Sequence, residues 1–328
     1  MPQDAVPQVV RPTTIEDIRA AAQRISKAAR RTPLLPLPVT GRVFVKMESL
    51  QRTGSFKLRG AYNALAQLSP EQRARGVVTH SSGNHGQGLA CAASMLGCPA
   101  TIVIPEGAPQ IKVDRTLSWG ARVVRCGPSA AEREGTAAAE AEKHGLTLIP
   151  PFDHPDVIAG QGTVGLEIVE QLPDVANVLV PVGGGGLISG ISLAVKSLKP
   201  DVRVFGVEPE LAADAGEAFR KREAVRWDSA LTTRTIADGV RTQEVGVNNL
   251  PLILEHVTGF LTATESSIVE AARFYALEAK LVAEPTGALT LAAWRELPAG
   301  ESPLADGPTV LVLSGGNVAP DLLARLAA

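Results

Sequence analysis

The sequence Val180-Pro-Val-Gly-Gly-Gly-Gly-Leu-Ile-Ser-Gly190 joins a short apolar run, 178–182, to a longer apolar segment of helical spacing, 187–198. Four consecutive glycines between a strand and a helix allow backbone N–H groups to close around an anion, and the helix dipole adds a favourable charge. A tight turn without a ligand would need only one or two glycines. The stretch therefore predicts a strand, a phosphate-binding loop and a helix in succession.

The same order of elements repeats outward from this stretch. Runs rich in Val, Ile and Leu predict further strands at 43–47, 77–80, 101–104, 121–126, 147–149, 202–207 and 310–313. Amphipathic segments predict helices at 85–96, 130–143, 157–171 and 265–280, and an N-terminal helix begins near Thr13 and Thr14. This alternation indicates an α/β protein whose mainly parallel sheets are covered by helices on both faces. Ligands bind such sheets beyond the carboxyl ends of the strands.

Length and composition exclude several classes of protein. The chain has 328 residues, 32 basic and 34 acidic, so its net charge of −2 lacks the basic excess of a nucleic-acid-binding protein. At about 150 residues per domain, the length predicts two domains. Cys91, Cys98 and Cys126 are odd in number and have no paired spacing, which favours a reducing compartment over disulfides or zinc. With neither a signal peptide nor an apolar run of about 18 residues, we expect a cytoplasmic protein that spans no membrane.

A lysine motif, Thr53-Gly-Ser-Phe-Lys-Leu-Arg-Gly60, follows the first predicted strand. Gly54 and Ser55 are typical of a helix start with Ser55 as the cap, which places Lys57 in the first turn. A cation there faces the positive end of the helix dipole, so the pKa of the amine is lowered. A neutral amine is the form required for Schiff-base chemistry. An isolated lysine is normally solvated, but together with the phosphate loop Lys57 becomes a candidate nucleophile.

Two further glycine clusters follow predicted strands. The sequence Ser81-Ser-Gly-Asn-His-Gly-Gln-Gly88 brings hydroxyls, an amide and N–H groups to a helix start, where a carboxylate can bind. The sequence Ser314-Gly-Gly-Asn317 follows the last strand and by itself predicts only a turn. Neither cluster alone indicates a binding site, and each becomes a candidate only because the chain also has the phosphate loop.

The phosphate loop leaves a second interpretation open. Gly184-x-Gly186-x-x-Ser189, with Glu208 about 20 residues on, is close to a dinucleotide-binding fingerprint. An NAD-dependent oxidoreductase is therefore an alternative. Its weakness is position, because the fingerprint would be expected at the first strand of a βαβ unit, whereas this loop follows more than half of the chain.

Taken together, these motifs resemble one enzyme family in order and spacing. Ser-Phe-Lys-Leu-Arg-Gly, Ser-Ser-Gly-Asn-His-Gly-Gln, the tetraglycine loop and Ser-Gly-Gly-Asn are similar to those of the serine/threonine dehydratases and serine racemase, which are pyridoxal-phosphate (PLP) enzymes of fold type II. The resemblance runs from about Thr32 to about Asn317 and includes Glu284-Pro-Thr286. It implies a small substrate domain, 76–152, inserted into a large PLP-binding domain, 1–75 and 153–328, with the cofactor between them.

The resemblance implies a set of cofactor contacts. Lys57 would bind the cofactor covalently and carry the α-proton of the substrate, and Ser314 would hydrogen-bond the pyridine nitrogen. The other implied contacts are Phe56 and Asn84 at the ring, and Gly183, Gly184, Gly185, Gly186 and Leu187 at the phosphate. A neutral hydroxyl at the ring nitrogen does not enforce a protonated ring, which suits prompt β-elimination.

The resemblance also implies a reaction. The substrate carboxylate would be held by Ser81, Ser82, Asn84 and His85, with Arg133 matching an arginine near that carboxylate in serine racemase. We expect L-threonine or L-serine ammonia-lyase activity, which forms 2-oxobutyrate or pyruvate plus ammonia.

Many dehydratases carry Ala where this chain has Ser82, whereas serine racemase uses Ser there as a second proton carrier. Serine racemase and a threo-3-hydroxyaspartate dehydratase are therefore alternatives, while the intact lysine, asparagine and serine set disfavours a relative without catalysis.

Two further sites are implied by the racemase branch. Glu208, Asp214 and the carbonyl of Ala212 have the spacing of its divalent-cation site, and carboxylates with carbonyl oxygens suit Mg²⁺. Gln87 and Lys112 match nucleotide-contacting positions, so an ATP or AMP effector is a further hypothesis. The resemblance also leads us to expect a homodimer or homotetramer.

Overall fold

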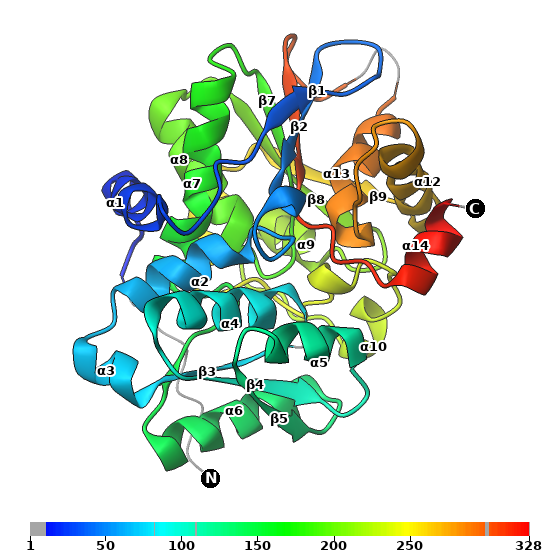
Figure 1. The fold of residues 1–328 in the computed structure, drawn as a ribbon. Helices are drawn as coiled ribbons and strands as arrows, with labels where there is room; N and C mark the ends of the chain where they lie inside the picture. Colours follow the sequence, from blue (N-terminus) through cyan, green and yellow to red (C-terminus); the bar gives the residue numbers. More distant parts are fainter. Residues whose placement is uncertain (1–10, 82, 109, 299–301, 328) are drawn as a thin grey trace.

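The computed structural model describes residues 11–81, 83–108, 110–298 and 302–327, and within them the strands form two sheets (Figure 1). The six-stranded sheet has the order β1-β2-β10-β7-β8-β9, and the four-stranded sheet has the order β5-β4-β3-β6. The larger sheet holds β1 (Leu34–Pro36), β2 (Val43–Met47), β7 (Asn177–Pro181), β8 (Arg203–Pro209), β9 (Gly259–Ala263) and β10 (Thr309–Leu313). The smaller sheet holds β3 (Val77–His80), β4 (Ala100–Pro105), β5 (Arg122–Cys126) and β6 (Thr147–Leu148).

All strand pairs are parallel except the antiparallel pair of β1 with β2, so the prediction of mainly parallel sheets is confirmed. All eight predicted strands are present, with ends that differ by at most two residues. The two strands that the sequence did not predict, β1 and β9, are both edge strands. Edge strands are short or half-exposed, and one contains Pro36 and the other Gly259, so neither has the continuous apolar run of a central strand.

The helices lie between the strands in the predicted places. Their bounds are α1 (Ile15–Ile25), α2 (Lys57–Ala66), α3 (Pro70–Arg75), α4 (Asn84–Leu96), α5 (Gln110–Leu117), α6 (Ala130–His144), α7 (Pro155–Gln171), α8 (Gly186–Leu198), α9 (Asp214–Lys221), α10 (Ser229–Thr232), α11 (Asn249–His256), α12 (Glu265–Leu277), α13 (Pro285–Arg295) and α14 (Pro320–Ala327), with short 3₁₀ turns η1 (Glu48–Leu50) and η2 (Asp238–Val240). Thr14 caps α1 in a capping box with Asp17, as expected at this start. No helix in the described ranges is long and apolar enough to cross a membrane.

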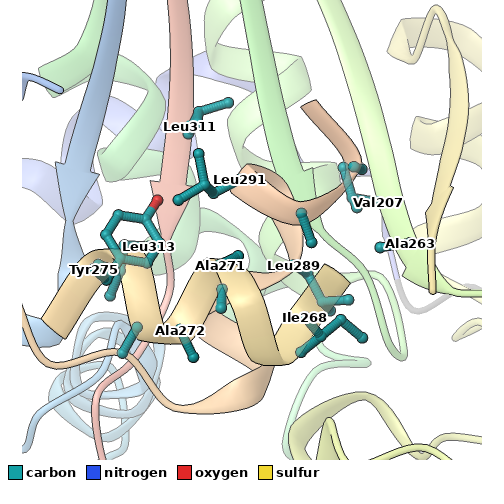
Figure 2. Close-up of a cluster of buried hydrophobic side chains, with 14 of the residues drawn as sticks. Val207, Ala263, Ile268, Ala271, Ala272, Tyr275, Leu289, Leu291, Leu311 and Leu313 are labelled. Atoms are coloured by element: carbon teal, nitrogen blue, oxygen red, sulfur yellow. The ribbon is translucent and has the colours of Figure 1, made fainter. Parts of the chain in front are cut away.

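The side chains of the central strands alternate between two apolar cores. Val178 and Val180 of β7 pack with α7 and α8, whereas Leu179 between them packs with α12 and α13 on the opposite face. Figure 2 shows this second core, in which Leu311 and Leu313 of β10 meet Tyr275 and neighbouring residues of α12 and α13. In the four-stranded sheet, α4 and α5 cover one face and α6 the other (Figure 1).

Close helix contacts hold the two sheets together and position the loops at their carboxyl ends. Gly88 of α4 lies against the start of α2, where an added Cβ would come within 3.0 Å of the carbonyl carbon of Lys57. Gly190 of α8 allows a similarly close approach to α7, since its Cβ would lie 2.4 Å from the carbonyl oxygen of Ile158. A side chain at Gly190 would clash and one at Gly88 would require its neighbours to shift, so these glycines allow the helices to approach closely next to Lys57 and the tetraglycine loop.

Candidate active site

A cavity of about 720 Å³ lies where residues from the two sheets meet, and the predicted site residues gather around it. Strand β3 reaches its edge with His80 and is followed there by Ser81. Strand β7 reaches it with Pro181, and β10 is followed there by Ser314. The predicted cofactor and substrate residues that line it are Phe56, Lys57, Ser81, Asn84, His85, Arg133, Gly183, Gly184, Gly185, Gly186, Leu187 and Ser314. Ser82 lies outside the described residues. The structure thus brings together motifs that are up to 258 positions apart, from Phe56 to Ser314.

Lys57 is the first residue of α2, in the first turn as predicted, but the helix start differs from the prediction. The N-cap is Phe56, and no side chain caps the helix. Ser55 instead forms an isolated β-bridge with Gly315, and its buried hydroxyl has no hydrogen-bond partner among the described residues. The capping role expected of Ser55 is therefore wrong, because the backbone of this residue is tied to the loop after β10.

The amine of Lys57 is chemically unusual. Its Nζ donates a hydrogen bond to the carbonyl oxygen of Pro151 at 2.7 Å, and no ion pair of this lysine is found within the described ranges. Burial without a compensating carboxylate lowers the pKa of the amine to about 8. The sequence predicted this direction from the helix dipole, whereas the structure attributes it to desolvation. An amine with this pKa is partly neutral near pH 7–8 and can act as a nucleophile and a base.

The tetraglycine loop has the conformation and space that an anion requires. Gly185 has φ = +96° and caps α8 without any side-chain hydrogen bond, so the first N–H groups of the helix stay open to a ligand. A Cβ at Gly184 would lie 2.4 Å from the ring of Phe152. The loop therefore needs glycine at these two positions, and it presents backbone donors to the cavity.

Ser314 offers an unused hydroxyl in the lining of the same cavity. It follows β10 directly, is 2% exposed, and its Oγ has no hydrogen-bond partner in the part of the chain that the structure describes. Buried hydroxyls in proteins nearly always have a partner. An orphaned Oγ that lines a cavity therefore fits an acceptor or donor on a bound ligand.

The start of α4 carries the predicted substrate contacts. Ser81 Oγ accepts a hydrogen bond from the backbone N of Gly83 at 3.2 Å. The ring of His85 is held by the carbonyl oxygen of Ile149, 3.2 Å from Nε2, so Nε2 carries the proton. Burial and the nearby charge of Lys57 lower the pKa of His85 to about 3, which keeps the ring neutral. In this geometry Nδ1 is an acceptor, and His85 could donate to a carboxylate only through its backbone N–H.

Glu284 lines the cavity and was given no role by the sequence, although its motif was recognised. Its Oε1 accepts a hydrogen bond from Asn84 Nδ2 at 2.6 Å. Burial raises the pKa of Glu284 to about 7, with a further contribution from the charge of Asp238. The Glu284 side chain makes no capping hydrogen bond to α13, so its contact with Asn84 and its place in the cavity lining mark it as a candidate site residue.

Charged residues from both sheets complete the walls. Arg133 of α6 lines the cavity, and its Nη1 donates to the carbonyl oxygen of Pro128 at 3.2 Å. Lys112 of α5 reaches across to η2, where its Nζ lies 2.7 Å from Asp238 Oδ2. Gln87, the other predicted nucleotide contact, is buried in α4 and is not among the lining residues.

The predicted metal ligands lie apart from this cavity. Both oxygens of Glu208 accept backbone hydrogen bonds at the start of α9, from Ala215 at 2.9 Å and from Gly216 at 2.7 Å. Burial, and then the charge of Asp214, raise the pKa of Glu208 well above its usual value, and burial raises the pKa of Asp214 to about 7. Among the described residues no group of three or more His, Cys, Asp or Glu side chains could hold a metal. The carbonyl of Ala212 would have to complete any such site.

A buried lysine and a glycine loop that line one cavity, between a larger and a smaller mainly parallel sheet, form the arrangement of PLP enzymes of fold type II. The chain belongs to the pyridoxal-phosphate dependent enzyme family, whose model matches residues 25–315. This membership favours PLP over the dinucleotide that the glycine fingerprint left open.

Three similar proteins illustrate the range of activities in this family. An L-threo-3-hydroxyaspartate ammonia-lyase from a Pseudomonas species is 44% identical over 93% of this chain and 96% of its own length. An L-threonine ammonia-lyase from Thermotoga maritima is 42% identical over 95% of this chain and 78% of its own length. The structure of maize serine racemase superposes with a TM-score of 0.90 at 36% identity, covering 96% of this chain and 97% of the maize chain.

Proposed function

We propose that the protein is a PLP-dependent ammonia-lyase that converts L-threonine or L-serine to 2-oxobutyrate or pyruvate plus ammonia. The observation that carries this proposal is the amine of Lys57, which lines the same cavity as the glycine loop and has its pKa lowered to about 8. The L-threonine ammonia-lyase relative supports the lyase reaction. Serine racemase and hydroxyaspartate ammonia-lyase relatives support the two alternatives.

The residues around the cavity fit PLP. Gly183 to Gly186 and Leu187 would hold the phosphate through open backbone N–H groups, and the orphaned hydroxyl of Ser314 would meet the ring nitrogen. Phe56 and Asn84 would contact the ring, and Lys57 would bind the cofactor covalently. When bound, PLP acts as an electron sink that stabilises negative charge at the α-carbon of an amino acid.

The side chains of this protein would bind the substrate and move its proton. The hydroxyls of Ser81 and Ser82 and the backbone N–H groups of Asn84 and His85 would hold the α-carboxylate. Arg133, which lines the same cavity as Ser81, Asn84 and His85, would lie nearby. Lys57, freed from the cofactor by the substrate, would accept the α-proton at Nζ. Its pKa near 8 suits this role, because the amine can take up and release a proton near neutral pH. The cavity walls would exclude water while the β-hydroxyl departs.

A 2-oxo acid assay tests the activity. Purified protein with PLP is incubated with L-serine, L-threonine and L-threo-3-hydroxyaspartate, and chiral analysis measures D-serine in parallel. We expect 2-oxo acid from threonine or serine to form faster than D-serine. D-serine forming faster than pyruvate would favour the racemase alternative, in which Ser82 carries the second proton. A protein that releases no 2-oxo acid from any of the three substrates would refute the lyase proposal.

A lysine pair provides the matched control. Lys57→Ala removes the amine that donates to Pro151, whereas Lys196→Ala removes an exposed amine that donates to the carbonyl oxygen of Pro200 at the same distance of 2.7 Å. We expect Lys57→Ala to abolish both the visible absorption of bound PLP and the activity. Lys196→Ala, outside the cavity, should leave both unchanged.

We also propose that Glu208, Asp214 and the carbonyl of Ala212 bind a divalent cation such as Mg²⁺. Two observations support this site. The buried carboxyl groups of Glu208 and Asp214 repel one another, and Asp214 Oδ2 has no hydrogen-bond partner among the described residues. Glu208 would have to turn from its two backbone donors to reach the ion. Thermal unfolding with Mg²⁺ or EDTA tests the site: Mg²⁺ should raise the melting temperature of the wild type, and should leave that of Asp214→Asn unchanged.

Three coarser features complete the proposal. We propose that 76–152 forms a small domain and that 1–75 with 153–328 forms a large one, a division supported by the separate four-stranded and six-stranded sheets. We propose a cytoplasmic location, because Cys91, Cys98 and Cys126 are all buried and free. We propose a homodimer or homotetramer; half-exposed Leu277 and Val282 are available for an interface. Light scattering of the purified protein measures the oligomeric state, and a monomer would refute that part.

A further inference from the structure

A chain of hydrogen-bonded side chains runs beside the cavity through Glu284, Asn84, Asn317 and Arg115. Asn84 Nδ2 donates to Glu284 Oε1 at 2.6 Å, and Asn317 Nδ2 donates to Asn84 Oδ1 at 2.8 Å. Asn317 Nδ2 also donates to the carbonyl oxygen of Thr53 at 2.7 Å, and Arg115 Nη1 donates to Asn317 Oδ1 at 3.2 Å. These residues come from the starts of α13 and α4, the loop after β10, helix α5 and the loop before Lys57, so the chain links five segments that are far apart in the sequence.

The ends of this chain decide how each amide group is turned. The carbonyl oxygen of Thr53 can only accept a hydrogen bond, and the guanidinium of Arg115 can only donate one. Asn317 must therefore present its amide nitrogen to Thr53 and its oxygen to Arg115. The same nitrogen of Asn317 also donates to Asn84, so Asn84 must accept with its amide oxygen. The amide nitrogen of Asn84 then points toward Glu284 and donates to it. One N–H of Asn84 is thereby used, and the second is left for a ligand in the cavity that Asn84 lines.

The backbone around this chain leaves room for it at two motif glycines. A Cβ at Gly315 would lie 2.3 Å from Glu284 Oε1. A Cβ at Gly54, whose φ is +73°, would lie 2.4 Å from Asn317 Oδ1. Glu284 itself is 5% exposed. These glycines therefore admit the carboxyl and amide groups rather than the cofactor, and the placement of Glu284 against Asn84 is closely constrained.

We propose that Glu284 is a positioning residue, which holds the amide of Asn84 in the one orientation that offers an N–H to the ring substituents of bound PLP. This inference rests on the proposed contact between Asn84 and the cofactor. Without the carboxyl group, the Asn84 amide would keep only its bond from Asn317 among the described residues, and its nitrogen could swing away from the ring substituents. The loss of the acceptor on Glu284 would therefore be felt at the cofactor itself.

The charges that face Glu284 add a readout. Burial, and then the charge of Asp238, raise the pKa of its carboxyl, whereas Asn84, Lys112 and the backbone N–H of Asn317 oppose that effect. Glu284 therefore changes charge near pH 7, within the range in which the bound cofactor can be studied. If it holds Asn84, its ionisation should alter the absorption of bound PLP.

Binding of PLP to the apoenzyme tests the proposal. Glu284→Ala removes the acceptor at the start of α13, and the control Glu296→Ala removes a carboxylate at the other end of the same helix, outside the cavity. We expect Glu284→Ala to weaken PLP binding about tenfold and to shift its visible absorption, because a buried donor loses its partner. Glu284→Gln should abolish the absorption change near pH 7. The control should match the wild type in both measurements.

A double-mutant cycle shows whether Glu284 acts through Asn84. If it does, Glu284→Ala combined with Asn84→Ala should weaken PLP binding no more than Asn84→Ala alone. Effects that add, or a Glu284→Ala protein that melts earlier but binds PLP with normal affinity and spectrum, would overturn the proposal. Should Glu284→Ala fail to fold, Asn317→Ala removes the other anchor of Asn84 and should weaken PLP binding in the same way. A wild-type protein that binds no PLP would instead refute the proposed function.

Discussion

Arg59 lies two residues after Lys57, and its replacement by methionine tests a buried ionic network that supports the lysine helix. The guanidinium is 1% exposed. Its Nε and Nη2 each lie 2.8 Å from a different oxygen of Glu48, which is fully buried, and its Nη1 lies 2.7 Å from Glu167 Oε1. Lys46, also fully buried, is 2.5 Å from the other oxygen of Glu167.

The expected loss of stability follows from what the substitution leaves behind. Without Arg59, Glu167 keeps Lys46, but Glu48 keeps only the hydroxyl of Thr32 at 2.5 Å as a direct partner. Leaving one charge of a buried pair without its partner costs about 3–5 kcal/mol of unfolding free energy. An exposed pair would contribute only about 0–1 kcal/mol. Because the network is buried, we expect Arg59→Met to lower the unfolding free energy by the larger amount.

Urea unfolding of the apoenzyme, followed by tryptophan fluorescence, measures this loss. Glu48→Gln combined with Arg59→Met removes the stranded charge and should recover part of the stability lost in Arg59→Met alone. The reasoning is refuted if the single variant loses less than about 1 kcal/mol, or if the double variant is no more stable than the single one.

Three other variants test the site. Gly184→Ala should prevent PLP binding, as measured by absorption of the reconstituted protein, because its Cβ would meet the ring of Phe152 at 2.4 Å. Ser314→Ala should weaken PLP binding without lowering the melting temperature of the apoenzyme, since its hydroxyl has no partner in the described structure; a large drop in melting temperature would contradict this. Glu284 has a pKa of about 7 in the folded protein against the usual 4.5. Between these two pH values the folded protein keeps a proton on Glu284 that the unfolded chain has lost. The contribution of this carboxyl to the unfolding free energy is therefore fully present below pH 4.5 and is lost as the pH rises through 7. The unfolding free energy of the wild-type apoenzyme should therefore decrease over this pH range by about 3 kcal/mol more than that of Glu284→Gln. Equal decreases in the two proteins would contradict the raised pKa of Glu284.

The central parts of the fold could be predicted because their sequences are locally unambiguous. A buried parallel strand such as β7 must be apolar on both faces, so a run of valines identifies it. The edge strands β1 and β9 have no such run, because one side of each is not paired in the sheet. Patterns of this kind depend on burial, which is why the interior was predicted and the sheet edges were not.

The parts of the site that depend on a local sequence motif could be predicted. The parts that depend on contacts between residues far apart in the sequence could not. The glycine loop and Lys57 line the cavity as predicted, but Ser55 does not cap α2. Its backbone pairs instead with Gly315, a long-range contact that a local capping rule does not consider. Glu284 was missed as a site residue because its contact with Asn84 spans 200 positions and has no local signature. The D-serine measurement above bears on the role of Ser82, and the role of Arg133 stays a prediction.

Helix α5 contacts the other side of the cavity through the charged side chains of Lys112 and Arg115. Lys112 meets Asp238 at 2.7 Å with 20% and 45% of their side chains exposed, and Arg115 meets Asn317 at 3.2 Å. An exposed pair of this kind contributes little at physiological ionic strength, where the Debye length is about 8 Å, and less as salt is added. The contact of α5 with η2 therefore weakens with ionic strength, while the apolar packing of α7 against α8 does not depend on it.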